Sequence, residues 1–242
     1  MSNRDAGSYR LGDLAFTLYV AALLAISVPV AWLVLVFLPD GRRADLWSKR
    51  WARWLLAASR CPLAITGADG LPDDRSVVFV SNHASYLDSI VLMAALQRPY
   101  RFVVARQYAA WPVVGSAIRK ARYITVDRRS AALRAAAADV IASALRDGDS
   151  VLVYPEGHRA NGPTLDRFHA GAFRTAAATG HAIVPIAVRG TRVVMGRGAR
   201  ILRRAPIEVI IHAPVRAASG DRTEIARVRD AVRSLIERSL GA

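Results

Sequence analysis

The 242-residue chain has very little cysteine and comparatively few acidic side chains. Its one cysteine, Cys61, excludes an intramolecular disulfide and a zinc cluster built from cysteines. Asp and Glu number 19 against 34 Lys and Arg, which gives a formal net charge of +15. This surplus favours an anionic partner, such as nucleic acid, acidic lipid or a phosphorylated substrate. No internal repeat or low-complexity linker divides the sequence, so its length fits one compact domain with an accessory segment.

Charge is absent from the 26 residues between Leu14 and Pro39. About 20 apolar helical residues cross a bilayer core, whereas the apolar core of a signal peptide has roughly 7–15 residues. Pro29 is expected to kink a helix that contains it, and the run could either span the membrane or return as a hairpin there. Basic residues predominate downstream, which favours a cytosolic location for the rest of the chain. We therefore expect residues 1–60 to attach the protein to the inner (cytoplasmic) membrane.

An amphipathic helix is predicted just after this run, with one face formed by Trp47, Trp51, Trp54 and Leu55. Lys49, Arg50 and Arg53 are expected on or beside its flanks. Tryptophan together with cations suits a helix that lies in the headgroup layer of a membrane. The alternative is that the tryptophans pack on the core of the folded domain, and the sequence leaves both readings open.

Strand and helix patterns alternate through the rest of the chain. Apolar runs rich in β-branched residues predict strands at 76–80, 102–105, 122–126, 150–154, 183–188 and 207–211. Helical stretches are predicted at 87–96, 109–120, 130–146, 170–179 and 221–240. This alternation indicates an α/β domain at 61–242, with a mixed, mostly parallel sheet flanked by helices. Functional sites in such sheets gather beyond the carboxyl ends of the strands.

His83 directly follows the first of these predicted strands, and Asp88 is five residues further on. A regular helix would separate the two side chains by about 140°, so we expect His83 in a loop and Asp88 in the first helical turn. Asp88 could then accept a hydrogen bond from one imidazole nitrogen and leave the other free as a general base. An Asp near a helix start is also a common cap, so the pair alone does not establish catalysis.

A second polar segment, with Glu156, Gly157 and Arg159, follows the predicted strand at 150–154. The planar guanidinium of Arg159 matches the geometry of a phosphate, and Gly157 lets the backbone approach a ligand closely. Glu156 could position Arg159 or accept hydrogen bonds from substrate hydroxyls. An ordinary turn with an exposed ion pair is the alternative.

Two further features are weaker when taken singly. Arg106, Lys120 and Arg128 could collect phosphate oxygens, or they could belong to ordinary solvated basic surface. Pro185 lies within the predicted strand at 183–188, and a proline there predicts a neighbouring sheet edge or bulge.

Four motifs in this order resemble those of the 1-acyl-glycerol-3-phosphate acyltransferase family. They are Asn82-His83-x4-Asp88, Pro112-x2-Gly115 followed by Arg128, Glu156-Gly157-x-Arg159, and Val184-Pro185-Ile186. The resemblance covers residues 60–215 or so. Two positions depart from the family pattern: His158 stands where Thr is usual, and His169 lies in a segment where a Lys often occurs.

The resemblance implies transfer of a fatty acyl group from acyl-CoA or acyl-carrier protein to the free hydroxyl of 1-acyl-glycerol-3-phosphate. The product would be phosphatidic acid for phospholipid synthesis. His83 would be the catalytic base and Asp88 would orient it. The residues carried over as binding the glycerol-phosphate group are Arg128, Glu156 and Arg159, with Gly157 giving access. Arg106 and Lys120 are weaker additions. The resemblance implies neither a metal nor a redox cofactor, and the expected partners are membrane lipids and the acyl donor.

Two alternatives remain at this point. The departures at His158 and His169 allow a different lysolipid acceptor, such as a lyso-ornithine lipid or another lysophospholipid. The charge of +15 allows a non-catalytic membrane protein that binds anionic lipid. A nucleic-acid partner is disfavoured because the sequence contains no nucleic-acid-binding motif. A serine hydrolase is disfavoured because there is no Gly-x-Ser-x-Gly segment.

Overall fold

The computed structural model describes residues 11–39, 41–71, 76–127, 129–162 and 164–241. A seven-stranded sheet forms its centre, in the spatial order β1 (Leu63–Thr66), β7 (Ile207–Ile211), β6 (Ala182–Arg189), β2 (Val77–Ser81), β5 (Ser150–Val153), β3 (Tyr100–Ala105) and β4 (Ile124–Val126). Neighbouring strands are parallel except β6 and β7, which are antiparallel. The expected mixed, mostly parallel α/β sheet is therefore confirmed.

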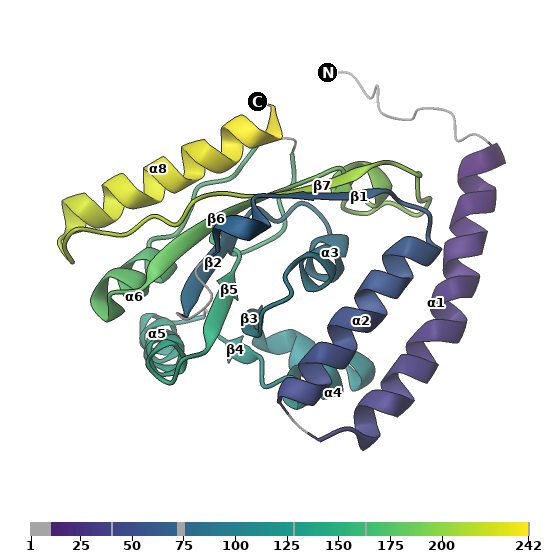
Figure 1. Ribbon diagram of the computed structural model, residues 1–242, viewed down its shortest axis with the longest axis horizontal. Coiled ribbons are helices and arrows are strands. Elements are labelled where there is room, and N and C mark those ends of the chain that lie inside the picture. Colours follow the sequence, from purple (N-terminus) through teal and green to yellow (C-terminus); the bar gives the residue numbers. More distant parts are fainter. Residues whose placement is uncertain (1–10, 40, 72–75, 128, 163, 242) are drawn as a thin grey trace.

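Helices cover both faces of this sheet (Figure 1). One side has α1 (Leu11–Phe37), α2 (Arg42–Ala58), α3 (Leu87–Ala95) and α4 (Pro112–Lys120), and the other has α5 (Ala131–Arg146), α6 (Gly171–Thr179) and α8 (Arg222–Leu240). The short helices are η1 (Ala68–Gly70), η2 (Arg106–Ala110) and α7 (Thr191–Val194). Helix α3 lies directly on the sheet, α2 lies outside α3, and α1 is outermost (Figure 1).

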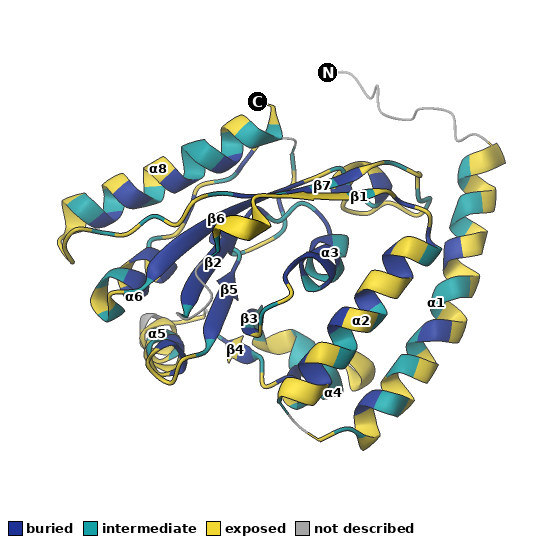
Figure 2. Cartoon of the chain, in the orientation of Figure 1, coloured by how far each residue is buried: buried dark blue, intermediate teal, exposed yellow. Residues whose placement is uncertain are grey.

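The central strands are buried on both faces, as Figure 2 shows. Along β2, Val77 and Phe79 belong to the core beneath α2 and α3, whereas Val78 and Val80 belong to the core beneath α5, α6 and α8. This follows from the two-residue period of a strand, which points successive side chains to opposite faces. A strand that is apolar at every position therefore needs helices on both sides.

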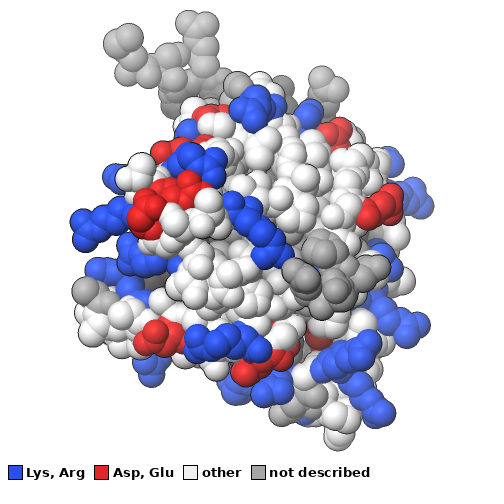
Figure 3. Space-filling view, turned by 60° about the vertical axis from the view of Figure 1, so that its left-hand side comes forward, with Lys and Arg blue, Asp and Glu red and all other residues white. Residues whose placement is uncertain are grey.

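The basic surplus is distributed over the surface. Figure 3 shows one face on which Lys and Arg side chains are separated by uncharged area and interspersed with Asp and Glu. Several arginines pair with neighbouring carboxylates, such as Arg227 with Glu224 and Arg233 with Glu237. Exposed pairs of this kind typically contribute about 0–1 kcal/mol each to stability.

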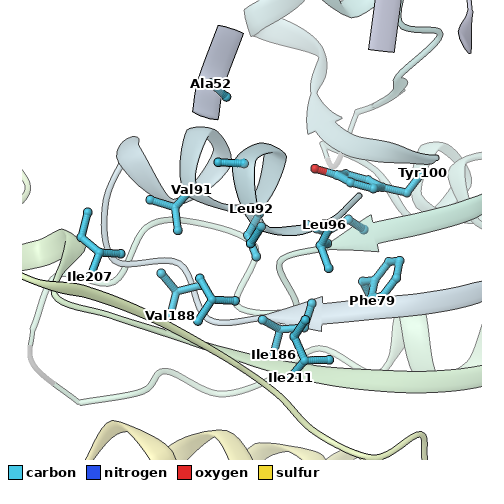
Figure 4. Packing of buried hydrophobic residues seen from close by; sticks show 14 of the residues in the cluster. Ala52, Phe79, Val91, Leu92, Leu96, Tyr100, Ile186, Val188, Ile207 and Ile211 are labelled. Atoms are coloured by element: carbon cyan, nitrogen blue, oxygen red, sulfur yellow. The ribbon is translucent and has the colours of Figure 1, made fainter. Parts of the chain in front are cut away.

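Helix α3 is fixed on the sheet by apolar packing along its whole length. Figure 4 shows Val91, Leu92 and Leu96 pointing toward the sheet residues, including Ile186, while Ala52 of α2 lies on the far side of α3. Each of these side chains is almost completely buried. Burying one aliphatic side chain of this size stabilises a fold by about 1.5–3 kcal/mol. The packing therefore determines where the first turn of α3, which carries Asp88, is held.

Helix α2 presents a different face to the protein from the one expected. Lys49 was expected on a flank of the tryptophan face, but it is buried and lies 2.8 Å from the Asp45 carboxylate. Its Nζ also donates a hydrogen bond of 2.6 Å to the carbonyl of Arg98. Burial raises the pKa of Asp45 and lowers the pKa of Lys49. The expectation for Lys49 was wrong because hydrophobic periodicity does not reveal a buried ion pair. Trp54, which belongs to the predicted tryptophan face, is instead 51% exposed.

Helix α1 continues without interruption through Pro29, so the apolar run does not turn back there. Its length and apolar composition are sufficient to cross a membrane. Buried core helices and signal sequences can have the same length and composition. Helix α1 is attached to the domain at several points along its length. The Tyr19 hydroxyl donates to the carbonyl of Ala58 at 2.7 Å, and the Trp32 indole donates to the Ser116 hydroxyl at 2.8 Å.

The predicted helix at 109–120 is in fact two elements, because η2 precedes α4. Trp111 between them is extended, with φ −76° and ψ 131°, and Pro112 is the first residue of α4. The reason is steric: a residue before proline avoids the helical region, whereas proline itself suits the first helical position. The short elements β1, η1 and α7 were not predicted.

Pro185 lies in β6 beside a local irregularity of the antiparallel β6–β7 region. Ile183 bridges to Val215 and Ile186 pairs with Ile211, so residues 184–185 face residues 212–214. The extra residue on the opposite strand marks a bulge, where a proline without an N–H group is tolerated. The predicted bulge next to Pro185 is therefore confirmed.

Gly115 yields a testable prediction about the junction of η2 and α4. A Cβ added at Gly115 would overlap the carbonyl oxygen of Ala109 and lie 2.8 Å from its carbonyl carbon. We expect Gly115→Ala to lower the free energy of unfolding by about 2 kcal/mol, as other overpacked sites do. Denaturant titration in detergent would measure the change.

Gly171 provides the matched control, because it begins α6 and a Cβ there would meet nothing within 4 Å. Gly171→Ala should leave stability unchanged or raise it by up to about 1 kcal/mol. Equal stabilities for the two variants would contradict the proposed contact at Gly115.

Candidate active site

The structure brings His83 and Asp88 together at the carboxyl end of β2. His83 lies in the loop after this strand, and Asp88 lies in the first turn of α3, as the spacing predicted. The imidazole Nδ1 and the Asp88 Oδ2 are 2.9 Å apart. Because a carboxylate only accepts hydrogen bonds, this contact requires a proton on Nδ1 of His83. The Asp88 side chain is fully buried, whereas the His83 side chain is 16% exposed.

Asp88 also shapes the loop that carries His83. Its Oδ2 atom accepts the backbone N–H groups of Ala84 and Ser85, at 2.7 and 2.8 Å. A helix cap normally accepts N–H groups from the turn that follows it. Here the carboxylate instead accepts groups from the residues before the helix, so it folds the loop back onto α3. One oxygen atom thus orients the imidazole and holds the backbone next to it.

The imidazole of His83 is stacked on the ring of Tyr154. The ring centroids are 4.0 Å apart and the planes differ by 11°. The Tyr154 hydroxyl lies 3.2 Å from the hydroxyl of Ser89 on α3, and burial raises the pKa of Tyr154 well above its ordinary value. Sequence analysis missed this residue. Its position at the end of the predicted strand at 150–154 could have indicated a place in the site, because that strand, β5, pairs with β2.

Strand β6 supports the same loop from the other side. The amide of Asn82 donates to the carbonyl of Val188 at 3.0 Å and accepts from its N–H at 2.8 Å. This side chain therefore continues the β2–β6 ladder beyond its last backbone pair. The Ser85 hydroxyl donates to the carbonyl of Met195, 2.7 Å away, just after α7. The fourth sequence motif thus lies beside the first, although about 100 residues separate them.

Glu156 connects the His83 loop to the segment that follows β5. Its Oε1 accepts the backbone N–H of His83 at 2.7 Å, and its Oε2 accepts the N–H of Asp166 at 3.1 Å. The residue is 1% exposed. Burial raises its pKa to about 7, although the two backbone hydrogen bonds oppose this shift. Both carboxylate oxygens face the protein backbone, whereas the sequence suggested contact with Arg159 or with substrate.

Arg159 lies at the rim of the site on an aromatic support. Its guanidinium carbon is 3.4 Å from the ring centroid of Tyr86, a residue of the His83–Asp88 segment. The rings of Tyr86 and Tyr108 meet edge to face at 6.4 Å. A guanidinium over a ring face keeps its edge N–H groups available for a planar anion. The sequence indicated Arg159 but not the role of Tyr86.

The remaining candidates have varied surroundings. Gly157 has φ 79°, a left-handed conformation that favours glycine. Arg106 is exposed on η2. Hydrogen bonds from Arg129 lower the pKa of Asp127, and the charge of Arg106 contributes to the same shift. Lys120 donates to the carbonyl of Leu38, 2.8 Å away, near the end of α1. Arg128 lies outside the described residues.

The departures from the family pattern lie near the rim. The His158 side chain is 56% exposed, with Nδ1 3.2 Å from the carbonyl of Arg159 and 3.8 Å from the Asp166 carboxylate. His169 is exposed as well. The contacts of His158 are thus to the segment 159–166. The arrangement therefore combines a half-buried imidazole, oriented by a buried carboxylate, with the more exposed side chains of Arg159 and His158.

Glu156→Gln should change how stability depends on pH. The pKa of Glu156 is raised from 4.5 to about 7 in the folded protein, so its stabilising contribution is complete below about pH 4.5 and is lost as pH rises through 7. Glutamine does not titrate. We therefore expect the Tm of the variant, measured relative to wild type, to improve between pH 5 and pH 8. The corresponding change in free energy is up to about 3 kcal/mol.

Unfolding scans of both proteins in detergent across this pH range would measure the difference. The amide also loses one of the two accepted N–H groups, so the variant should be less stable than wild type at pH 5. A difference in Tm that stays constant with pH would contradict the assigned burial of a titrating carboxyl.

Comparison with known proteins places these residues in a family. The model of the family described as Acyltransferase matches residues 62–189. A chloroplastic 1-acyl-sn-glycerol-3-phosphate acyltransferase of Arabidopsis thaliana is 33% identical over 159 residues, which are 65% of this chain and 44% of the relative. A lyso-ornithine lipid O-acyltransferase of Brucella abortus is 27% identical, over 95% of this chain and 97% of the relative.

The chain spans less than half the length of the plant relative. The crystal structure of a 1-acyl-sn-glycerophosphate acyltransferase from Thermotoga maritima has the same fold, with a TM-score of 0.79 at 19% identity. That match covers 96% of this chain and 95% of the other. The family model covers more than half of this chain and includes His83, Asp88, Glu156 and Arg159. The resemblance seen in the sequence is confirmed, and the chain belongs to the Acyltransferase family.

Proposed function

We propose that this protein transfers a fatty acyl group from an acyl thioester to the free hydroxyl of 1-acyl-glycerol-3-phosphate, which yields phosphatidic acid for phospholipid synthesis. One observation carries the proposal: His83 is oriented through Nδ1 by the buried Asp88, which leaves Nε2 free at the carboxyl end of a central strand. A hydroxyl acceptor needs a base placed in this way, because its proton must leave as the new ester bond forms.

The reaction requires two proton movements at one atom. His83 Nε2 takes the hydroxyl proton while the substrate oxygen attacks the thioester carbonyl. The tetrahedral intermediate then collapses, the carbon–sulfur bond breaks, and the imidazolium returns the proton to the departing thiolate. Asp88 keeps the imidazole in the required tautomer and stabilises the imidazolium that forms.

Glu156 and Tyr154 act as positioning residues in this proposal. Glu156 fixes the backbone of His83, and Tyr154 fixes the plane of its ring. Displacing a base by about 1 Å can cost roughly 100-fold in rate. We therefore assign Glu156 to the geometry of the base, in place of the acceptor contact first expected for it.

Arg159 is the acceptor-binding residue that the structure supports best. It lies at the rim on Tyr86, next to the loop of the base. A guanidinium binds phosphate through two parallel hydrogen bonds. Gly157 allows the backbone near Arg159 to approach the acceptor, and Arg106 and Arg128 remain additional candidates by resemblance.

The donor in this proposal is acyl-CoA or acyl-carrier protein. A thioester is already activated, so the chemistry requires neither a metal nor a redox cofactor. The acceptor and the product are membrane lipids, which agrees with the long apolar helix α1. We place the enzyme at the cytoplasmic membrane with its catalytic domain on the cytosolic side, because basic residues predominate after α1.

A lyso-ornithine lipid is the second candidate acceptor. Its support is the Brucella abortus relative, which matches this chain over nearly the full length of both proteins. His158 beside Arg159 also departs from the pattern of phosphate-acceptor enzymes. The difference between the two candidates lies in the headgroup, and the reaction at His83 is the same.

His83→Ala should reduce product formation by roughly 100- to 10,000-fold, the usual contribution of a general base. Membranes containing each variant would receive labelled acyl-CoA and 1-acyl-glycerol-3-phosphate. His212→Ala is the matched control, because the His212 imidazole lies against α8, with Nε2 3.0 Å from the Ser239 hydroxyl. Undiminished product with His83→Ala would overturn the assignment of the base and would favour a non-catalytic lipid-binding role.

Arg159→Ala should mainly raise the KM for the phosphorylated acceptor. Loss of a charge-assisted contact of about 1.5–3 kcal/mol corresponds to roughly a 10- to 100-fold change in KM. Arg174→Ala on α6 is the control, because Arg174 is exposed on the other side of the sheet. Kinetics on a panel of lysolipids would make the measurement, and a preference of wild type for lyso-ornithine lipid would overturn the phosphate assignment.

A further inference from the structure

The first turn of α4 carries exposed apolar side chains that the proposed reaction does not use. Trp111, Val113 and Val114 are 51%, 39% and 41% exposed, and we call these three residues the α4 patch. Gly115 and Ile118 of the same helix are buried against the protein. The orientation of α4 is thus fixed by its buried side, and that orientation leaves the α4 patch in solvent.

Helix α1 adjoins the α4 patch directly. The Trp32 indole of α1 donates to the Ser116 hydroxyl at 2.8 Å, and this hydroxyl donates to the carbonyl of Val113 at 2.7 Å. Leu33 and Phe37, from the same part of α1, are 55% and 80% exposed. The apolar surface of α1 therefore continues onto the α4 patch.

The α4 patch also connects to the candidate active site through a row of rings. The Trp111 ring lies 5.3 Å from the ring of Tyr108, which lies 6.4 Å from the ring of Tyr86. Tyr86 carries the guanidinium of Arg159 and belongs to the loop between His83 and Asp88. Amphipathic aromatic rings of this kind are typical of the boundary between lipid and water.

Exposed arginines lie on the elements next to the α4 patch. The N–H of Gly41 donates to the carbonyl of Lys120 at 2.7 Å, which joins the start of α2 to the end of α4. Exposed arginines near this junction include Arg42 and Arg43 at the start of α2, Arg119 on α4, Arg122 just after α4, and Arg106 on η2. Arginines around an apolar surface complement a bilayer with anionic headgroups.

We propose that the α4 patch inserts into the same leaflet of an anionic phospholipid bilayer as the exposed face of α1. The opening of the active site then faces the headgroup layer, and a lysolipid reaches His83 past Trp111, Tyr108 and Tyr86. This inference rests on the proposed function, in that it assumes an acceptor that is itself a membrane lipid.

A fluorescent probe tests the insertion without any turnover. Cys61, the one cysteine of the chain, is buried, so Val113→Cys adds a single exposed thiol for labelling. Val140→Cys is the matched control, because Val140 is 50% exposed on α5, across the sheet. Full-length proteins would be reconstituted in vesicles of phosphatidylcholine and phosphatidylglycerol that carry nitroxide-labelled acyl chains. We expect at least two-fold stronger quenching at position 113, and equal or weaker quenching there would overturn the proposal.

Kinetics with two forms of the acceptor test the consequence for catalysis. Val113→Asp combined with Val114→Asp should lower the rate at least ten-fold when the lysolipid is presented in these vesicles. The rate with a short-chain lysolipid dissolved as monomers should stay within two-fold of wild type, and Val140→Asp should affect neither rate.

Equal losses with both acceptors, or no loss with vesicles, would overturn the role of the α4 patch. A failure of the proposed reaction would be seen separately, as absence of product from the wild-type protein with either acceptor. The quenching comparison would still decide whether the patch enters the bilayer.

Discussion

A single carboxylate oxygen determines the geometry of the candidate site. Asp88 Oδ2 accepts hydrogen bonds from the His83 imidazole and from the N–H groups of Ala84 and Ser85. Burying a carboxylate costs free energy unless hydrogen-bond donors compensate it. These three donors therefore stabilise the observed conformation of the loop. The apolar packing of α3 on the sheet in turn fixes the position of Asp88. Core packing and the orientation of the His83 imidazole are thus linked through Asp88.

The topology of the sheet explains why motifs far apart in the chain meet. Strands β6, β2, β5 and β3 are consecutive neighbours, and all four run parallel. Their carboxyl ends therefore lie along one edge, where Val188 meets Asn82 and Glu156 meets His83. Glu156 and Asn82 act as cross-links between loops that belong to different strands. The more exposed Arg159 lies outside this network, with its guanidinium over the ring of Tyr86.

The outermost helices relate the site to its surroundings. Helix α2 is held on the domain by hydrogen bonds from Lys49 to the carbonyl of Arg98 and from Arg53 to the carbonyl of Ala94. Helix α1 is held on α2 and α4 by hydrogen bonds from Tyr19 and Trp32. Helix α1 lies beside α4, and the rings of Trp111, Tyr108 and Tyr86 run from the start of α4 to the loop between His83 and Asp88. For the membrane-lipid acceptor proposed above, this row of rings leads from α4 toward His83.

The sequence by itself determined the α/β class and most strands and helices, because these depend on local periodicity. Its spacing allowed Asp88 to reach His83 and allowed either a sheet edge or a bulge at Pro185, and the structure shows the contact and the bulge. The sequence did not reveal the buried Lys49, the stacking of Tyr154 on His83 or the backbone contacts of Glu156. Each of these depends on residues from separate elements that meet only when the sheet has formed. Only the tertiary structure decided them, because burial and the order of strands set which polar groups face one another.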